Sequence, residues 1–126
     1  MGDQHTVLVV EDEWTAREVA VMWLQTAGFR VMTAENGEHA ASLLRDGASA
    51  DLVLTDINLG GHLNGWDIGT IAREVCPDMP VVYVSGLCDN PLRRVGGSLF
   101  FAKPYDCNVV LEACCQMCRE ADDRTH

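Results

Sequence analysis

Charged and polar residues stand directly after four apolar runs of the sequence. Glu11 and Asp12 follow the run VLVV, and Asp56 follows LVLT. Ser85 comes after VVYV, and Lys103 comes after FFA. Three carboxylates, a hydroxyl and an ammonium are the groups needed to hold a divalent cation and to place a phosphoryl group on a carboxylate. That chemistry requires a fold that brings the five side chains to one place.

Carboxylates crowded in this way repel one another. Two full charges ~5 Å apart repel by about 3 kcal/mol at an effective dielectric constant of about 20. Such a cluster therefore shifts a pKa or binds a cation, and oxygen ligands favour a hard divalent ion such as Mg²⁺. Taken singly, each residue has a simpler explanation, because aspartate and serine after a strand commonly cap a turn. The joint arrangement favours phosphoryl chemistry.

Apolar runs alternate with helix-like segments along the chain. We expect strands at residues 6–10, 29–33, 52–54, 81–84 and 99–102. Four of these runs are continuously apolar, which is typical of parallel strands covered on both faces, whereas 29–33 alternates like an edge strand. The alternation of strands and helices predicts right-handed βαβ units in a doubly wound α/β domain. Ligands of such sheets bind beyond the carboxyl ends of the strands, where the five residues stand.

Helix signals fill the intervals between the expected strands. Thr15 and Glu18 form a T-x-x-E capping box, and Gly28 is expected to end that first helix. Further helices are expected at residues 36–47, 65–76 and 106–121. A fourth helix between the last two strands is expected to be short or irregular, because the segment SGLCDNPLRRVGGS contains a proline and a Gly-Gly pair.

Length and charge restrict the class of protein. The 126 residues, 48% of them hydrophobic, suit a single domain over residues 1–126 with a core of about 6–121. A net charge of −10 disfavours binding to nucleic acid or to anionic lipid. The apolar runs are too short to span a membrane, and the start MGDQH lacks the features of a signal peptide, so a cytoplasmic location is expected.

Six cysteines could indicate a disulfide framework, but their spacing favours a helix core. Cys107, Cys114 and Cys118 recur at helical intervals in the last segment, which predicts small hydrophobic residues on one helix face. The alternative is a metal or redox site built on CCQMC. A tetrahedral zinc site needs further ligands, and no second C-x-x-C pair is present elsewhere.

Four segments resemble, in order, the signature segments of response-regulator receiver domains of two-component and phosphorelay systems. They are LVVEDE, LVLTDINLGG, VVYVSG and FFAKP, and the resemblance covers nearly the whole chain. It implies a CheY-like, or flavodoxin-like, sheet of five parallel strands in the order 2-1-3-4-5, with helices on both faces. It also implies that the Lys103–Pro104 bond is cis, a geometry largely confined to bonds that precede proline.

The same resemblance implies a role for each residue at the strand ends. Asp56 would be the phosphoacceptor, Ser85 the hydroxyl that moves onto the phosphoryl group, and Lys103 the lysine that pairs with it. Phe100 matches the position of the family's switch aromatic, where many members have tyrosine, although a plain core phenylalanine is an equal alternative. Mg²⁺ would be held by four residues, with Asp12 the more direct acidic ligand: Glu11, Asp12, Asp56 and the backbone carbonyl of Asn58.

Two further departures from the family pattern affect the surroundings of the site. The loop after Asp56 has Gly60 where a proline often stands and is one residue longer, so we expect it to order only with Mg²⁺ or phosphate bound. The segment between Ser85 and Lys103 is several residues shorter than in typical members. It would normally carry a helix that, with the fifth strand, forms the signalling face.

The expected function is that of a single-domain response regulator. It would take a phosphoryl group from a phosphohistidine of a sensor histidine kinase or phosphotransfer protein, and signal by contact with an unknown protein target. Enzymatic activity beyond its own phosphorylation and dephosphorylation is not expected. The receiver module of a hybrid kinase is a variant of this hypothesis.

Two other classes of function are disfavoured. A Mg²⁺-dependent phosphatase would need a general acid where Asn58 stands. A flavin-binding module would need a phosphate loop where the acidic EDEWTAR stands.

Overall fold

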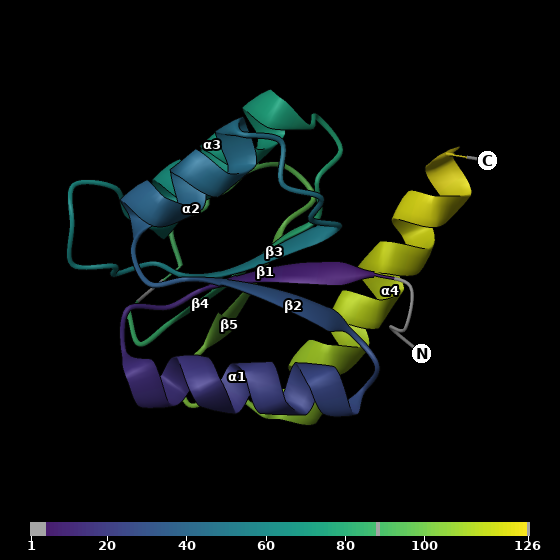
Figure 1. Ribbon diagram of the computed structural model, residues 1–126, viewed down its shortest axis with the longest axis horizontal. Coiled ribbons are helices and arrows are strands. Elements are labelled where there is room, and N and C mark those ends of the chain that lie inside the picture. The colour runs from purple at the N-terminus through teal and green to yellow at the C-terminus, as the bar shows by residue number, and fades with distance from the viewer. Residues whose placement is uncertain (1–4, 88, 126) are drawn as a thin grey trace.

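Five parallel strands form one sheet in the order β2-β1-β3-β4-β5, as the sequence resemblance implied (Figure 1). The computed structural model describes residues 5–87 and 89–125. The strands are β1 Thr6–Val10, β2 Arg30–Ala34, β3 Leu52–Asp56, β4 Val81–Ser85 and β5 Leu99–Ala102. The helices are α1 Trp14–Thr26, α2 Gly37–Arg45, α3 Gly65–Val75 and α4 Cys107–Thr125.

Two pairs of helices cover the two faces of the sheet. Helices α2 and α3 lie on one face, and α1 and α4 lie on the other (Figure 1). Each face has its own apolar cluster: Leu44, Ile68 and Tyr83 belong to the first, and Leu24 and Val110 belong to the second. Strands β3 and β4 are buried along their whole length because both faces are covered.

The edge strands differ in part from the sequence prediction. Strand β2 is an edge strand, as its alternating pattern indicated. It begins at Arg30, one residue later than predicted, and the buried Phe29 lies outside the strand. Strand β5 lies at the other edge, and Leu99, Phe100 and Phe101 are only half-buried. The expectation that β5 is covered on both faces is therefore wrong. Its apolar run reflects partial packing at an edge.

The start of α1 corrects the predicted capping box. The carboxylate of Glu13 accepts hydrogen bonds from the backbone N–H groups of Thr15 (2.9 Å) and Ala16 (2.8 Å). Glu13 is thus the N-cap, and Thr15 lies inside the helix, so Thr15 and Glu18 do not form the box that the T-x-x-E pattern predicted. Gly28 follows the helix with φ 96°, as expected of a C-terminal glycine.

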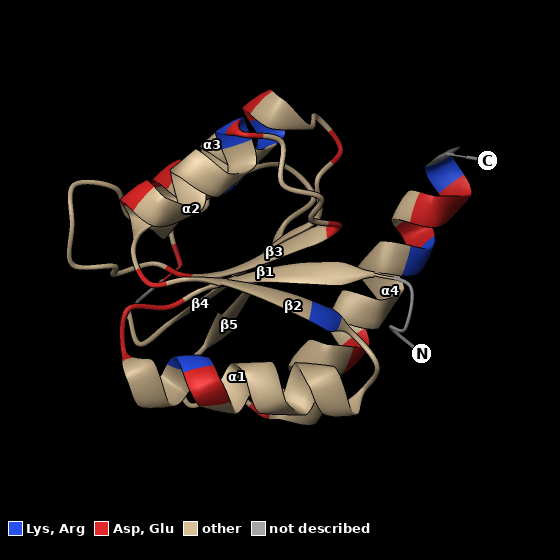
Figure 2. Ribbon diagram, in the orientation of Figure 1, with Lys and Arg blue, Asp and Glu red and all other residues tan. Residues whose placement is uncertain are grey.

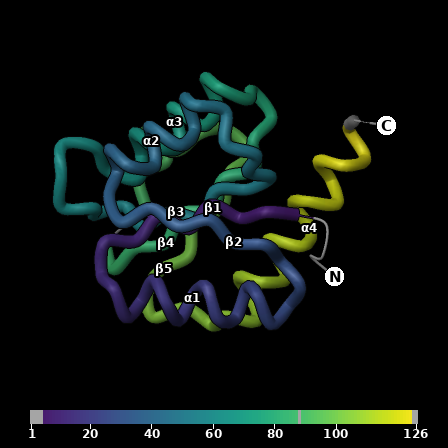
Figure 3. Tube along the Cα trace, in the orientation of Figure 1, coloured from purple at the N-terminus to yellow at the C-terminus, as the bar shows by residue number. Residues whose placement is uncertain are grey.

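The last helix, α4, extends four residues beyond the predicted end at Ala121. The prediction stopped where the apolar periodicity stops, but polar contacts continue along the helix. Gln116 donates a hydrogen bond to Glu120 (3.0 Å), and His5, just before β1, bonds to Asp122 (2.9 Å). Both ends of the described chain therefore lie at the end of the sheet where the strands begin (Figure 3).

No helix is present among the described residues between β4 and β5, in agreement with the prediction of a short or irregular one. Two turns form there: Arg93 N–H (2.9 Å) and Arg94 N–H (3.2 Å) donate to Asn90 C=O, and Ser98 N–H donates to Val95 C=O (3.2 Å). The segment is fastened to the rest of the fold by Arg93, which forms an ion pair with Asp67 of α3 at 3.2 Å. Within the described ranges, no helix has the length and apolar character needed to cross a membrane.

Tyr83 of β4 also contacts this segment. Its side chain reaches the segment past Gly69 of α3, where the missing side chain leaves a notch in the helix surface. Its hydroxyl accepts a hydrogen bond from Val95 N–H at 3.2 Å. The ring passes so close to Gly69 that a methyl group at that position would lie 2.0 Å from the Tyr83 hydroxyl oxygen. Tyr83 is fully buried, so it has little room to move away.

Gly69→Ala should therefore destabilise the fold by about 1–3 kcal/mol, because the added methyl overpacks the core. In Tyr83→Phe the clashing oxygen is gone, and the nearest ring atom lies 2.9 Å from the same methyl position. The double mutant should then lose less free energy of unfolding than the sum of the two single mutants. Urea unfolding of the wild type, the two single mutants and the double mutant measures these free energies. Strictly additive losses would contradict the close contact between Gly69 and Tyr83.

Candidate functional site

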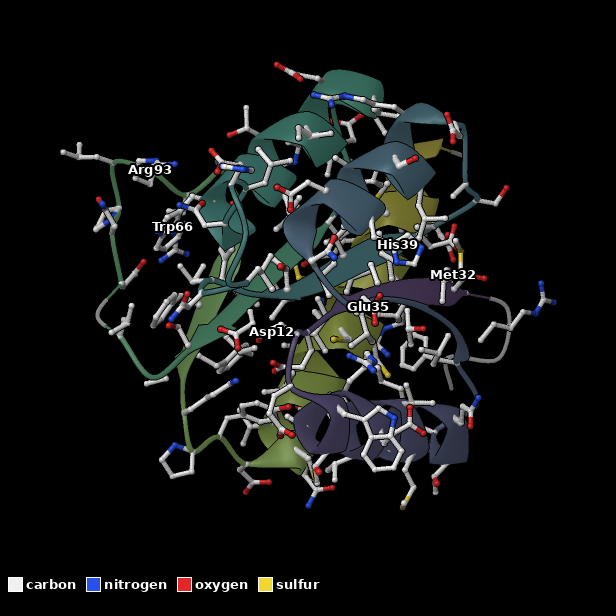
Figure 4. All side chains as sticks on the ribbon, turned by 60° about the vertical axis from the view of Figure 1, so that its left-hand side comes forward. Asp12, Met32, Glu35, His39, Trp66 and Arg93 are labelled. Carbon is white, nitrogen blue, oxygen red and sulfur yellow. The ribbon has the colours of Figure 1, made fainter. Side chains whose placement is uncertain are left out.

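The carboxyl ends of four strands meet at one edge of the sheet. Because β1, β3, β4 and β5 run in the same direction, the residues that end or follow them converge there. One pocket is lined by the residues singled out in the sequence, which are Glu11, Asp12, Asp56, Asn58, Ser85 and Lys103. Figure 4 views this edge, with Asp12 near the centre, Trp66 and Arg93 to one side and Glu35 and His39 to the other.

Three carboxylates of the pocket lie close enough to share one cation. Glu11, Asp12 and Asp56 each offer an oxygen atom within 4.8 Å of the others. Glu11 and Asp56 are buried, whereas Asp12 is exposed to solvent. Acidic residues gather at this edge in the ribbon coloured by charge (Figure 2). A set of oxygen donors alone fits a hard divalent ion such as Mg²⁺.

The Asp56 carboxylate is held at both of its oxygens. Oδ1 accepts hydrogen bonds from Ile57 N–H at 2.7 Å and, more weakly, from Asn58 N–H at 3.4 Å. Oδ2 accepts from the Lys103 ammonium at 2.8 Å. Asp56 is 8% exposed, so a small face of the carboxylate remains open to the pocket. A buried, fixed and partly neutralised carboxylate of this kind can act as a nucleophile.

Lys103 bridges two of the acids. Its ammonium also donates to Glu11 Oε1 at 3.1 Å. Burial alone would lower the pKa of Lys103, but the hydrogen bonds to Asp56 and Glu11 outweigh it and raise that pKa above its ordinary value. Lys103 N–H continues the β5 ladder by donating to Ser85 C=O at 2.8 Å, and the following bond to Pro104 is cis, as expected.

The surroundings of Glu11 disfavour its ionised form. Burial raises its pKa above the ordinary value of 4.5, and the negative charge of Asp56 raises it further. Hydrogen bonds from Glu13 N–H (3.1 Å) and from Lys103 act in the opposite direction without cancelling the shift. Glu11 is therefore harder to ionise than a carboxylate in water, chiefly because it is buried.

Ser85 lines the pocket, whereas Phe100 packs against the core cluster under α2 and α3. The buried Ser85 hydroxyl oxygen accepts a hydrogen bond from Leu87 N–H at 3.0 Å, which leaves the hydroxyl proton available for another acceptor. Phe100 is half-buried and stacks on Trp66 of α3, with ring centroids 6.2 Å apart. This packing agrees with a core phenylalanine, and the role of Phe100 as a switch stays a prediction.

Three of the four cysteines of α4 pack into the core, whereas Cys107, which the spacing placed on the same buried face, is only half-buried. Cys114, Cys115 and Cys118 are buried in the cluster beneath α1 and α4. Burial raises the pKa of Cys114 and of Cys118 to about 12 in each case, so these thiols stay protonated and unreactive near neutral pH.

Sequence reasoning missed several residues that shape the site. Glu13 and Leu87 line the pocket, and Glu38 of α2 bonds to the loop that follows Asp56. The Asn64–Asp67 capping box that starts α3 was readable as N-x-x-D before an apolar segment. The contact of Glu38 joins residues 24 apart, and no local pattern reveals such a pair.

Known proteins match this chain over most of its length. A family model described as response regulator receiver domain matches residues 7–114. The transcriptional regulatory protein CusR of Escherichia coli K12 is 37% identical over 103 residues, which are 79% of this chain and 44% of that protein. The autoinducer 1 sensor kinase/phosphatase LuxN of Vibrio campbellii is 33% identical over 81 residues, or 64% of this chain and 9% of that protein.

A solved structure agrees in fold as well as in sequence. The crystal structure of a response regulator receiver protein from Sinorhizobium medicae WSM419 superimposes with a TM-score of 0.85 at 31% identity, covering 91% of this chain and 94% of that one. The two curated relatives are longer, and this chain spans less than half of either.

The raised pKa of Glu11 predicts that the stability of the metal-free protein depends on pH. Since its folded pKa is raised above 4.5, the stabilising contribution of the protonated carboxyl is complete below that pH and is lost as the pH rises through the folded pKa. Glu11→Gln removes the penalised charge, so at about pH 7.5 it should be more stable than wild type, and at about pH 4 nearly equal to it. Urea unfolding in EDTA measures the difference. A less stable Glu11→Gln at neutral pH would show that the ion pair with Lys103 outweighs burial.

Proposed function

The chain belongs to the response regulator receiver domain family, and we propose that Asp56 is the residue that accepts its phosphoryl group. Receiver domains of this family are the phosphoacceptors of two-component signalling. The observation that carries the assignment is the Asp56 carboxylate itself, which is held by Ile57 N–H and Lys103 between two further acids. Of the three clustered carboxylates, it is the one that the Lys103 ammonium approaches most closely, at 2.8 Å.

We propose Mg²⁺ as the cofactor, held by Glu11, Asp12, Asp56 and the backbone carbonyl of Asn58. The oxygen donors fit this ion, and the three clustered carboxylates face the single ammonium of Lys103, so a cation would balance their remaining charge. Asp12 is the exposed member, so it offers the first carboxylate to an ion that arrives with its water. When bound, the ion would neutralise the acids and the oxygens of the incoming phosphoryl group.

The transfer step uses residues that are already in place. An oxygen of Asp56 attacks the phosphorus of a phosphohistidine, and the new O–P bond forms as the N–P bond breaks. The imidazole nitrogen keeps the electron pair and takes a proton from solvent. Lys103 can then donate to a phosphoryl oxygen, and the Ser85 hydroxyl, whose proton is free, can donate to another. Water later attacks the same phosphorus, the O–P bond to Asp56 breaks, and inorganic phosphate leaves with the carboxylate restored.

A protein partner suits the surface beside the pocket. An apolar groove between α1 and the start of α4 shares Glu11 and Lys103 with the site and is lined by Val19, Trp23 and Tyr105. A donor protein can bury apolar side chains there while its phosphohistidine reaches Asp56. We propose a sensor histidine kinase or phosphotransfer protein as the donor.

We further propose that the chain acts in the cytoplasm as a single-domain response regulator and signals by contact with a protein target. The net charge of −10 supports a protein target over nucleic acid or a membrane surface.

Incubation with Mg²⁺ and a small phosphodonor should add one phosphoryl group to the protein, measured by intact mass. Asp56→Asn should add none, because the amide oxygen is a poor nucleophile. Asp78→Asn, a matched change at an exposed aspartate, should behave like wild type. Steady release of phosphate from many organic monoesters without an adduct would indicate a phosphatase instead.

Magnesium binding should change the fluorescence of Trp14, which is exposed and lies two residues from Asp12. Asp12→Asn removes the exposed ligand and should weaken Mg²⁺ binding by about 10- to 100-fold. Fluorescence titration of both proteins gives the two dissociation constants. Equal constants would contradict Asp12 as a ligand.

A further inference from the structure

The loop at residues 57–64 leaves Asp56 and returns to it. Gly65 N–H donates to Ile57 C=O at 2.7 Å, and a methyl group at Gly65 would lie 2.2 Å from the carbonyl oxygen of Asp56. Between these ends the loop carries Asn58 and Gly60, and a methyl group at Gly60 would lie 3.4 Å from Asp12 Oδ2. The loop projects from the carboxyl edge beside the start of α2 (Figure 1).

Glu38, in the first turn of α2, fastens the outer part of this loop. Its Oε2 atom accepts a hydrogen bond from His62 N–H at 2.9 Å. A methyl group at Gly61 would lie 2.6 Å from Glu38 Oε1, so the carboxylate fits closely against bare backbone. Hydrogen bonding by backbone N–H groups of Glu38 itself, His62 and Leu63 lowers the pKa of Glu38 below its ordinary value, so it is fully ionised near neutral pH.

The amino end of α2 is itself fixed against the loop. A methyl group at Gly37 would lie 2.5 Å from the Leu63 carbonyl oxygen, so helix and loop touch through their backbones. Asn36 caps the helix by accepting a hydrogen bond from His39 N–H at 2.7 Å. The sequence suggested that this loop orders only with Mg²⁺ or phosphate bound. The contacts of Gly37 and Glu38 provide an anchor from within the protein.

We propose that Glu38 is a positioning residue for the metal site, and that its hold on the loop sets the affinity for Mg²⁺. The inference rests on the proposed function, because it concerns the ligand carbonyl of Asn58. Glu38 bonds to the backbone at His62, four residues beyond Asn58, so it acts through the loop. A loop held in place before the ion arrives loses less conformational freedom on binding, which strengthens binding.

Three variants test this inference by fluorescence titration with Mg²⁺ alone. Glu38→Ala removes both acceptor oxygens and should raise the Mg²⁺ dissociation constant on the order of tenfold, at the low end of effects for residues that support metal ligands. Glu38→Gln keeps one acceptor oxygen and should fall between Glu38→Ala and wild type. Glu35→Gln removes the same charge from an exposed neighbour and should stay within about twofold of wild type.

Phosphorylation by a small phosphodonor separates positioning from general damage. In Glu38→Ala the Mg²⁺ concentration for half-maximal rate should rise by the same factor as the dissociation constant, while the rate at saturating Mg²⁺ stays near that of wild type. A purely structural role would lower the thermal midpoint, measured by circular dichroism, without changing the affinity.

The inference is overturned if Glu38→Ala binds Mg²⁺ as tightly as wild type, or if Glu35→Gln weakens binding as much as Glu38→Gln does. Loss of the rate at saturating Mg²⁺ would also overturn it, because Glu38 would then act on the transfer step. Failure of the proposed function is distinct from these outcomes, since the wild-type protein itself would show no response to Mg²⁺.

Discussion

One ammonium group between two buried carboxylates is the interaction on which the site depends. Lys103 donates to Asp56 at 2.8 Å and to Glu11 at 3.1 Å, and it comes from the strand farthest from β1 on that side of the sheet. Buried acids this close repel each other unless a cation lies between them. Lys103 brings one positive charge to a cluster of three carboxylates, so it compensates only part of their charge. The remaining charge is the physical basis for the divalent-ion site that we propose.

The surroundings of this charge cluster are held by close backbone contacts. Gly65 lies directly against the Asp56 carbonyl, and Gly37 lies against Leu63, so neither position has room for a side chain. These contacts let the loop after Asp56 pass between α2 and the pocket. Glu38 then adds a charged anchor to a loop that holds a predicted ligand. Geometry at the metal site is therefore shared between the sheet and helix α2.

The described residues of the segment between β4 and β5 form no helix, although family members normally have one there. Two turns replace it, and the segment is tied to α3 by the ion pair of Arg93 with Asp67 and to β4 by the hydroxyl of Tyr83. Ser85 opens this segment, and its hydroxyl bonds to Leu87 N–H. The pocket and this segment therefore share a residue at the end of β4.

The sequence by itself determined the alternation of strands and helices, the strand-end positions of the acids, Ser85 and Lys103, and the burial of Cys114 and Cys118. These follow from local periodicity and from the rule that parallel strands end at one edge. The sequence misplaced the N-cap of α1 and the end of α4. Glu13 and Thr15 are both possible caps in the sequence, and the polar last turn of α4 has no apolar periodicity to mark it as helix. Only the tertiary structure decided that β5 is half-buried, that Tyr83 fills the notch at Gly69, and that Glu38 meets His62. Those contacts join residues far apart in the chain, and their distances follow from how whole elements pack.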